Sequence, residues 1–497
     1  MKNINKKKLI RKGRIGKGVF FPMKNMTLKL FSAAALTGLL LISEGCVSSK
    51  TPVAISRGTY TEILKEEHQT LPKDIGMLTL DEAQNIAIQN NPSFKSAYYA
   101  IEAARAQYYK AFSYYMPTVS FKYSLGQSHS FARNADAGAD VRNFSSSPSF
   151  GASLLVFDSF QREMNLFAAK HSWNESAAAQ EDARRLLLRS VAFAYNEVLL
   201  ANAKTRIAKA NMRYNLDLLK ETELKFEAGA SPLSDVLNFK VNYNSAESTR
   251  YSAEYAAVAA KLALAQLLGL TEGTIPDSVG FPLMPSPDGE MLAGIEFYLD
   301  QALKNRPDLK QYREAYEVAK YNYYSSIGAF GPTVSFDVSL NYGDNHRWSK
   351  NKWAENEDDS GVIRTSPESW GLDYGMTISW EIFSGGRTYF TMRAAQANLN
   401  AVDFQVANVW SNVIADVRTA YENYQTNLKQ VKLNQKNLEL VRKQRDLVNL
   451  EYNAGSTGIT RLNEAQTAFI NAENALAEAV INMHNAKAQL QAATNEL

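Results

Sequence analysis

The chain has 497 residues, a formal net charge of +3 at pH 7 and one cysteine. The small charge excludes a broad basic surface for nucleic acid, because much of the positive excess precedes residue 30. One cysteine excludes an internal disulfide framework. The five histidines are scattered, and no phosphate-binding loop or nucleophile elbow is present. We therefore expect neither an enzyme nor a bound cofactor or metal.

Residues 1–45 predict an export signal with a basic leader. Lysines precede an apolar run over residues 28–42, which is too short to span a membrane permanently. Translation can start at any of three methionines without loss of this signal: Met1, Met23 or Met26. The mature protein is therefore expected to be exported.

Cys46 lies shortly after the apolar run, in the sequence Ser43-Glu44-Gly45-Cys46. A glycine before cysteine resembles a bacterial lipobox, in which the cysteine is acylated and becomes the new N-terminus. Ser43 and Glu44 depart from that pattern, and a buried or spare thiol is the alternative. We expect lipidation at Cys46, with residues 46–77 as a lipid-anchored tether.

Two related halves organise the rest of the chain. Asn91-Pro92 recurs as Arg306-Pro307, and the segment 116–121 recurs at the same offset as 331–336. Later matches have a larger offset, which indicates an insertion, and we expect it as an exposed loop within 341–369. A proline-rich stretch between the halves cannot be regular helix. The predicted domains are a first repeat at 78–270, an equatorial linker at 271–295 and a second repeat at 296–497.

Each repeat is predicted to consist mainly of helix. Thr79 and Glu82 form a capping-box pattern, and this first helix is expected to run to about Tyr115. Residues 161–228 and 387–454 contain no proline and are rich in helix-forming residues, which predicts two helices of about 100 Å. Apolar positions in the second helix step by four and three in an eleven-residue period, so these helices should pack nearly straight.

Segments with alternating polarity lie between these helices. In each repeat, two segments carry apolar residues at every second position, which predicts one β-hairpin with an apolar and a polar face. In the first repeat the apolar positions are Val119, Phe121, Tyr123, Leu125, Phe150, Ala152, Leu154 and Val156. Strands of about ten residues with this pattern fit an outer-membrane barrel better than a soluble sandwich, since no other sheet is predicted to cover them. Four strands cannot close a barrel, so it must be shared among subunits.

Three motifs carry a resemblance to a known family. They are Asn305-Arg306-Pro307-Asp308-Leu309, Phe383-Ser384-Gly385-Gly386-Arg387 and Leu267-Leu268-Gly269-Leu270. On these motifs, the chain resembles the TolC-like outer-membrane efflux proteins over nearly its whole mature length. The resemblance implies a mainly α fold, with a long periplasmic α-helical barrel and four β-strands per protomer, in a homotrimer that shares one twelve-stranded membrane β-barrel. One departure is the segment 157–162, which lacks the family's paired glycines, and we expect it to affect only the local turn.

The resemblance also implies partners, namely outer-membrane lipid, a periplasmic adaptor protein and an inner-membrane pump. The adaptor is expected to dock at the tips of the helical hairpins. The tip residues are Gly229, Ser231 and Pro232 in the first repeat, and Gly455, Thr457 and Gly458 in the second. Gly229 can end one helix, Ser231 can cap the next, and Pro232 suits its first turn. A plain helical turn is the alternative.

Charged residues just after the tips are expected to gate the channel, because the tunnels of this family narrow there. Asp235 and Arg461 lie at matching positions after the two tips with opposite charges, and Glu464 follows Arg461. We expect an Asp235–Arg461 clasp, repeated around a threefold axis, to hold the entrance shut. Family members often have an acid at the position of Arg461, so the ring chemistry can differ here. Alternatively, Asp235 favours a helix N-terminus and Arg461 is solvated.

The expected function is a passive, gated conduit in the outer membrane with a periplasmic extension. It would export small toxic molecules such as drugs, dyes, detergents or metal ions from the periplasm to the exterior. A polypeptide duct of a type I secretion system is an alternative in the same class. A helical surface rod or adhesin is an alternative from another class, and release into the soluble fraction without detergent would favour it.

Overall fold

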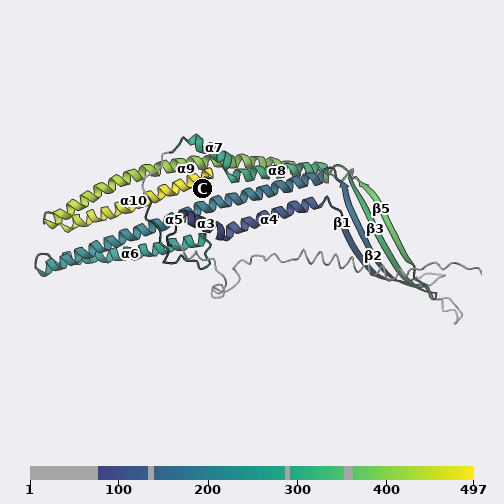
Figure 1. Cartoon of the computed structure of the whole chain (residues 1–497), viewed down its shortest axis with the longest axis horizontal. Coiled ribbons are helices and arrows are strands. Elements are labelled where there is room, and N and C mark those ends of the chain that lie inside the picture. The colour runs from purple at the N-terminus through teal and green to yellow at the C-terminus, as the bar shows by residue number, and fades with distance from the viewer. Residues whose placement is uncertain (1–75, 132–138, 286–291, 352–361, 497) are drawn as a thin grey trace, which may run out of the picture. The chain divides into compact units, whose positions relative to one another are not determined.

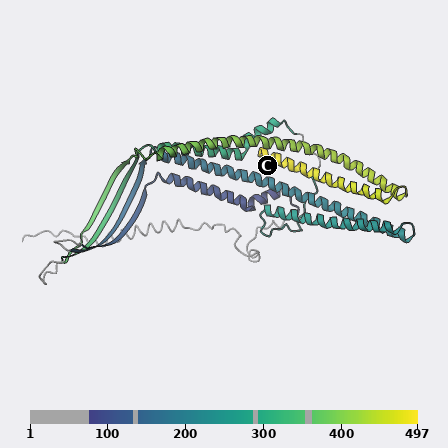
Figure 2. The same ribbon diagram turned by 180° about the vertical axis from the view of Figure 1, so that it is seen from behind.

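The structure is a computed structural model, and it describes residues 76–131, 139–285, 292–351 and 362–496 (Figures 1 and 2). The chain divides into two units, residues 1–67 and 68–497, and all the described residues belong to the second. The predicted signal, Cys46 and nearly all of the predicted tether lie outside the described residues. Within the described ranges, no helix carries an apolar stretch that would let it span a bilayer.

The first predicted helix is two helices, α3 (Leu80–Asn90) and α4 (Pro92–Ser113). The predicted capping box is confirmed, since Thr79 Oγ1 accepts from the Glu82 amide and the Glu82 carboxylate accepts from the Thr79 amide. The prediction of one continuous helix was wrong, because proline disfavours helical backbone in the residue before it. Asn91 accordingly has φ −61° and ψ 121°, and its side chain caps α4 by accepting from the amides of Ser93 and Phe94.

The two long predicted helices are confirmed as α5 (Gln161–Glu227) and α9 (Arg387–Asn453), each of 67 residues. Each is followed by a shorter antiparallel helix, α6 (Leu233–Leu267) after α5 and α10 (Ile459–Thr494) after α9 (Figure 1). The predicted apolar row of α9 faces its neighbours. Its buried members are Val413, Val417, Ala420, Tyr424 and Val431. Two further helices, α7 (Ile295–Asn305) and α8 (Pro307–Gly328), precede the second hairpin.

The strands form one antiparallel sheet, and its two predicted hairpins are confirmed. Strand β1 (Thr118–Phe131) pairs with β2 (Ala139–Phe157), and β2 pairs with β3 (Thr333–Asn351). Strand β3 in turn pairs with β5 (Glu368–Ser379) and with the short β4 (Val362–Thr365).

The expected exposed loop at 341–369 is largely strand. Asn341 pairs with Ser149 and Asn351 with Ala139, so this polar half of β3 continues the ladder, and β4 also lies within the expected loop. Backbone pairing does not require apolar side chains, and polarity alone therefore misplaced the end of the strand. Residues 352–361 lie outside the described residues.

The register gathers the apolar residues on one face of the sheet. Phe121 lies opposite Phe150, which lies opposite Leu340, and Leu340 lies opposite Leu372. The next row on the same face is Val119, Ala152, Val338 and Tyr374, and the row between them on the other face is Ser120, Gly151, Ser339 and Asp373. No helix of the described residues covers the apolar face near Tyr374, which is 75% exposed. This face suits lipid, and the opposite one suits water.

The elements follow one order from edge to edge. Next to the sheet, α4 packs on α5, α5 on α8, and α8 on α9. Toward the hairpin tips, α6 packs on α5, α5 on α10, and α10 on α9. In the described part of one chain, β1, α4 and α6 therefore form one edge, while β5 and α9 form the other. Both edges require a neighbour, which fits a chain that completes its barrel with further copies.

The ends of two helices meet tightly beside the linker. Asn91 Nδ2 donates to the Leu267 carbonyl oxygen at 2.9 Å, which joins the start of α4 to the end of α6. Gly269 follows with φ 68°, and a Cβ there would lie 2.7 Å from the Asn90 carbonyl oxygen. This junction therefore requires glycine for both its conformation and its closeness.

Gly269→Ala should lower the free energy of unfolding by more than Gly273→Ala. Both glycines have left-handed φ values, 68° and 67°, so alanine costs about 1–2 kcal/mol at either position. Only at Gly269 would the new Cβ also contact backbone, since nothing lies within 4 Å at Gly273. Urea unfolding of the detergent-solubilised protein, followed by helical circular dichroism, measures the difference. Equal losses for the two variants would contradict a tight junction.

Candidate functional site

The two hairpin tips have the same backbone turn. Gly229 has φ 71°, and the Ala230 amide donates to the Lys225 carbonyl oxygen at 2.8 Å. At the second tip Gly455 has φ 72°, and the Ser456 amide donates to the Glu451 carbonyl oxygen at 2.9 Å. Such left-handed glycine turns satisfy carbonyl groups that the end of a helix leaves without partners.

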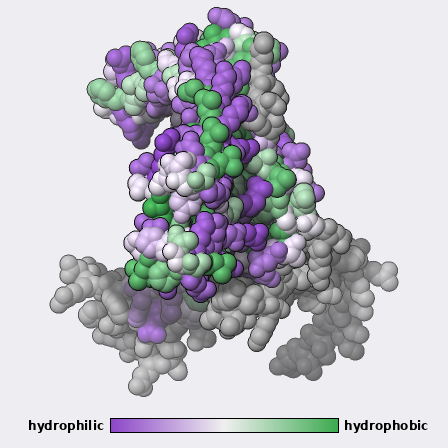
Figure 3. Space-filling model, turned by 90° about the vertical axis from the view of Figure 1, so that its left-hand side faces the viewer, coloured by the Kyte–Doolittle hydropathy of each residue, from purple (hydrophilic) through white to green (hydrophobic). Residues whose placement is uncertain are grey.

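The second helix of each hairpin starts without a side-chain cap. Pro232 is the N-cap residue of α6 and Gly458 that of α10, with Thr457 half-buried beside it. The expectation that Ser231 caps α6 was wrong, because the helix begins one position later. Instead, the Ser231 hydroxyl donates to Asp235 Oδ2 at 3.3 Å. Figure 3 views the chain from the side of the tips, where hydrophilic residues are interspersed with hydrophobic ones.

The two hairpins are joined just above their tips. A shared apolar cluster and two side-chain hydrogen bonds cross between them. The cluster contains Leu218, Leu219, Val236 and Phe239 from the first hairpin and Val448, Leu462 and Ala465 from the second. Asn463 donates to Asn238 Oδ1 at 3.0 Å, and Gln466 donates to Asn211 Oδ1 at 3.0 Å. A side-chain hydrogen bond therefore reaches from the second turn of α6 to the second turn of α10.

Asp235 lies in the first turn of α6 and Arg461 in that of α10, but these expected gate residues are not paired as predicted in one chain. Arg461 is 65% exposed, and its guanidinium lies 3.9 Å from the Glu451 carboxylate. Asp235 instead accepts from Ser231, and Glu464 is exposed. No ion pair joins Asp235 to Arg461 among the described residues of the single chain. The clasp stays a prediction.

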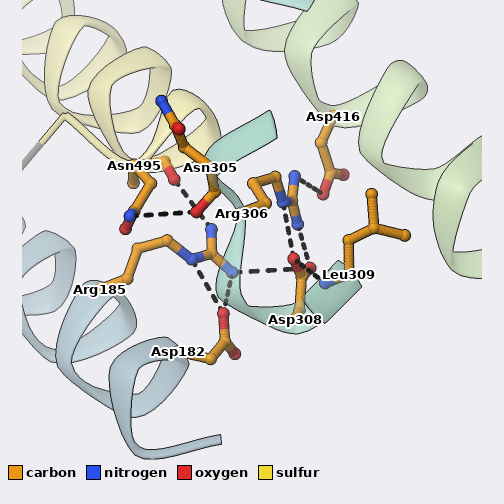
Figure 4. Close-up of polar contacts among 9 residues, drawn as sticks. Asp182, Arg185, Asn305, Arg306, Asp308, Leu309, Asp416 and Asn495 are labelled. Carbon is orange, nitrogen blue, oxygen red and sulfur yellow. Dashed lines mark hydrogen bonds and ion pairs between the residues drawn. The ribbon is translucent and has the colours of Figure 1, made fainter. Parts of the chain in front are cut away.

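A buried charged network joins four helices where α10 ends and α8 begins (Figure 4). Arg185 of α5 donates to the Ala492 carbonyl oxygen near the end of α10 at 3.0 Å and to Asp182 Oδ1 at 2.6 Å. The side chain of Arg185 is only 6% exposed. A cation at this place stabilises the C-terminal end of α10, whose last carbonyl groups carry partial negative charge.

Arg306 extends the network to α9. Its Nε donates to Asp308 Oδ1 at 3.0 Å, and its Nη1 donates to Asp416 Oδ2 at 3.1 Å. Asp308 also accepts from the Leu309 amide in the first turn of α8 and lies 3.9 Å from Arg185. The Asp308 carboxylate therefore favours the N-terminal end of α8 while it links both arginines.

The network keeps Asp308 charged. Burial opposes ionisation of this carboxyl, but its hydrogen bonds and charge interaction with Arg306, together with the charge of Arg185, hold its pKa below the usual range. The sequence identified Arg306 and Asp308 only as part of a family motif. It did not indicate that Arg185 is buried in a charged network, because a charged residue in a long helix is normally exposed to solvent.

The comparisons with known proteins agree with this architecture. The model of the outer membrane efflux protein family matches residues 84–270 and 298–496. The chain belongs to this family. It is 23% identical over 426 residues to the alkaline protease secretion protein AprF of Pseudomonas aeruginosa, covering 84% of this chain and 83% of AprF. It is also 21% identical over 434 residues to the outer membrane protein TolC of Escherichia coli strain K12, covering 84% of each.

A solved structure supports the fold independently. The outer-membrane channel OprN superposes with a TM-score of 0.69 at 18% identity, over 84% of this chain and 89% of that one. The protein is thus an outer-membrane efflux channel with a periplasmic extension. It works as a homotrimer with a shared twelve-stranded barrel, and a periplasmic adaptor and an inner-membrane pump are its partners. The alternative of a surface rod or adhesin is wrong, because the apolar face of the sheet and the family both indicate a membrane channel.

Asp308→Asn should destabilise the protein strongly at neutral pH. The change removes the one carboxylate that contacts both buried arginines and leaves Arg185 with Asp182 and Arg306 with the more exposed Asp416. Breaking these buried charge contacts costs on the order of 3 kcal/mol. Because the folded pKa of Asp308 is lowered, its contribution is complete above the ordinary aspartate pKa of about 3.9 and is lost as pH falls through the lowered value. The gap between wild type and variant should therefore shrink only in strong acid.

Thermal unfolding at a series of pH values tests this, with Asp277→Asn as the control. Asp277 is fully exposed and pairs with Lys261 at 3.5 Å, so its loss should change the midpoint little at any pH. Similar effects of the two substitutions at neutral pH would contradict a stabilising role for the buried network.

Proposed function

We propose that the chain is the outer-membrane channel of a tripartite efflux system that exports small toxic molecules. The observation that carries the proposal is the sheet with one apolar and one polar face, continued by helices whose free edges require further copies. Such an assembly is a conduit with no energy source of its own, so the inner-membrane pump drives transport. Drugs, dyes, detergents and metal ions are the proposed cargo.

The choice of small molecules rests on two features. The family whose model matches this chain is described as the outer membrane efflux proteins, and efflux is the function in that description. The motif Arg306-Pro307-Asp308 has the style of pump-linked members, and its side chains form part of the buried network. A lipid anchor at Cys46, followed by a tether at 46–77, would add to this assignment.

Polypeptide secretion is the second candidate, and a specific observation favours it. AprF, to which the chain is similar over most of its length, is named for the secretion of a protease. A folded or unfolded polypeptide would use the same barrel and the same tips. The two candidates therefore differ in the cargo that the pump delivers, and they make different predictions for a deletion strain.

A deletion strain should become hypersensitive to several unrelated small toxic molecules. Growth is compared with that of the complemented strain across dyes, bile salts, antibiotics and metal ions, while the proteins in the culture medium are compared in parallel. Hypersensitivity that complementation restores supports efflux. Normal growth together with the loss of a secreted protein would overturn efflux in favour of secretion.

The same proposal includes a gate at the tips, where the adaptor is proposed to dock on Gly229, Ser231, Pro232, Gly455, Thr457 and Gly458. The hydrogen bond between Asn238 and Asn463 supports it, because Asp235 and Arg461 lie within one turn of these asparagines. Arg461 would close the clasp by exchanging its long contact with Glu451 for Asp235. Three such pairs around the axis, with Glu464 nearby, would hold the entrance shut until the adaptor competes for them.

Asp235→Arg should raise the resting conductance of single channels in planar bilayers, because it places two cations together at the entrance. Adding Arg461→Asp restores an opposite pair and should lower the conductance again. The control is the double exchange of Glu439 and Lys443, an exposed pair at 2.8 Å on α9, which should leave conductance unchanged. This pair lies about 15–20 Å along α9 from its end at the tip. Unaltered conductance in both tip variants would rule out the clasp.

A further inference from the structure

The turn from β2 to α5 has a backbone that its side chains do not favour. Ser159 and Phe160 have φ values of 56° and 65°, in the left-handed region. The matching turn of the second repeat, between β5 and α9, has Gly385 and Gly386 there, at 64° and 87°. Glycine adopts this region without penalty, whereas an aromatic residue does so at a cost in free energy. The presence of Phe160 where the second repeat has glycine therefore requires an explanation.

Packing explains why the turn exists but not why Phe160 is there. The Ser159 hydroxyl donates to the Pro332 carbonyl oxygen at 2.8 Å. Gly328 and Gly331 make room for Ser159, since a Cβ on either would contact it, at 2.6 Å from the Ser159 carbonyl oxygen in the case of Gly328. These contacts hold the backbone in the left-handed turn, as strained conformations require. The ring of Phe160 is 62% exposed and fills no core.

The ring lies at the margin of the apolar face of the sheet. The rings of Phe157 and Phe160 pack edge to face with their centroids 5.6 Å apart. Phe157 lies opposite Val334, and Val334 lies opposite Ile378, which is 65% exposed. This row continues the apolar rows that face lipid. The ring of Phe160 thus extends that face by one step toward the helices.

A second copy of the chain does not cover this place. Strand β2 has β1 on one side and β3 on the other within the same chain, so it lies inside the sheet and away from both edges. Neighbouring copies complete the barrel through the edges β1 and β5. The surroundings of Phe160 in the trimer are therefore membrane or water.

The second repeat places an aromatic ring beside the same turn by another route. A Cβ on Gly386 would lie 3.3 Å from the ring of Phe390, which follows one turn later in α9 and is 69% exposed. The ring of Phe390 thus occupies space next to Gly386. Gly386 is the residue that corresponds to Phe160 of the first repeat. In the first repeat the residue corresponding to Phe390 is Met164. Both repeats present a ring here, and only the first does so at a cost in backbone strain.

We propose that the ring of Phe160 anchors the channel in the interfacial layer of the periplasmic leaflet of the outer membrane. The partner is the phospholipid surface, at the boundary between head groups and acyl chains, where amphipathic and aromatic side chains are stabilised. The free energy gained from this contact offsets the strain of the left-handed turn. Three copies in the trimer set the height of the barrel on this side, together with Phe390.

The test places a nitroxide label on Phe160→Cys and compares its collisions with oxygen, which enters lipid, and with a water-soluble nickel chelate. The trimer is reconstituted in vesicles of phosphatidylethanolamine and phosphatidylglycerol. Phe336→Cys on the apolar face of β3 is the lipid control, and Ala210→Cys on the exposed side of α5 is the aqueous control. Wild type labelled identically gives the contribution of Cys46.

The expected result is an oxygen-to-nickel collision ratio at position 160 severalfold above that at 210 and close to that at 336. A ratio at 160 equal to that at 210 would overturn the proposal. If the cysteine variant does not assemble, Phe160→Trp in the same vesicles gives a second measurement. Its additional emission should be quenched by brominated phospholipid, and quenching by aqueous iodide alone would equally overturn the anchor.

Discussion

A β-sheet in a membrane must not leave an edge, because hydrocarbon offers no partner to backbone N–H and C=O groups. In one chain β1 and β5 each lack a neighbour on one side within the described residues, and the apolar face of the sheet continues to both edges. Closing the ring with further copies removes this penalty. The helices also leave two open edges that need a neighbouring copy, because α4 and α6 continue the edge of β1 while α9 continues the edge of β5. Each chain of the trimer thus forms one third of the wall of the channel.

About half-way along the wall of the channel, one helix of each repeat ends and another begins in its place. The two repeats join these helix ends by different chemistry. In the first repeat the end of α6 meets the start of α4 through an asparagine, a backbone carbonyl and a left-handed glycine. In the second repeat the end of α10 meets the start of α8, where Asn495 takes the left-handed conformation and donates to the Asn305 carbonyl oxygen. There the contacts are reinforced by Arg185, Arg306 and Asp308. Duplication preserved the geometry, while one junction acquired buried charge.

Both helix junctions answer the same physical need. A helix that stops inside a packed layer leaves its last carbonyl groups without partners. The helix that replaces it leaves its first amide groups without partners. Arg185 donates to a carbonyl of α10, and Asp308 accepts from an amide of α8, so a pair of opposite charges satisfies both ends. Asn91 fills a comparable role at the other junction with one uncharged side chain. The wall can therefore change helices without a gap in its hydrogen bonding.

The sequence by itself determined the long helices and the two-faced strands, because periodicities of about 3.6 and of two residues follow from local geometry. It also determined the tip glycines, since a left-handed turn leaves few alternatives to that residue. The break between α3 and α4 is local too, since Pro92 disfavours helical backbone at Asn91. Only the tertiary structure decided how far β3 extends and which charges meet. The backbone of β2 continues the polar half of β3, and Arg185 meets Asp308 through packing between distant segments. These two outcomes depend on partners remote in the chain, which no local pattern encodes.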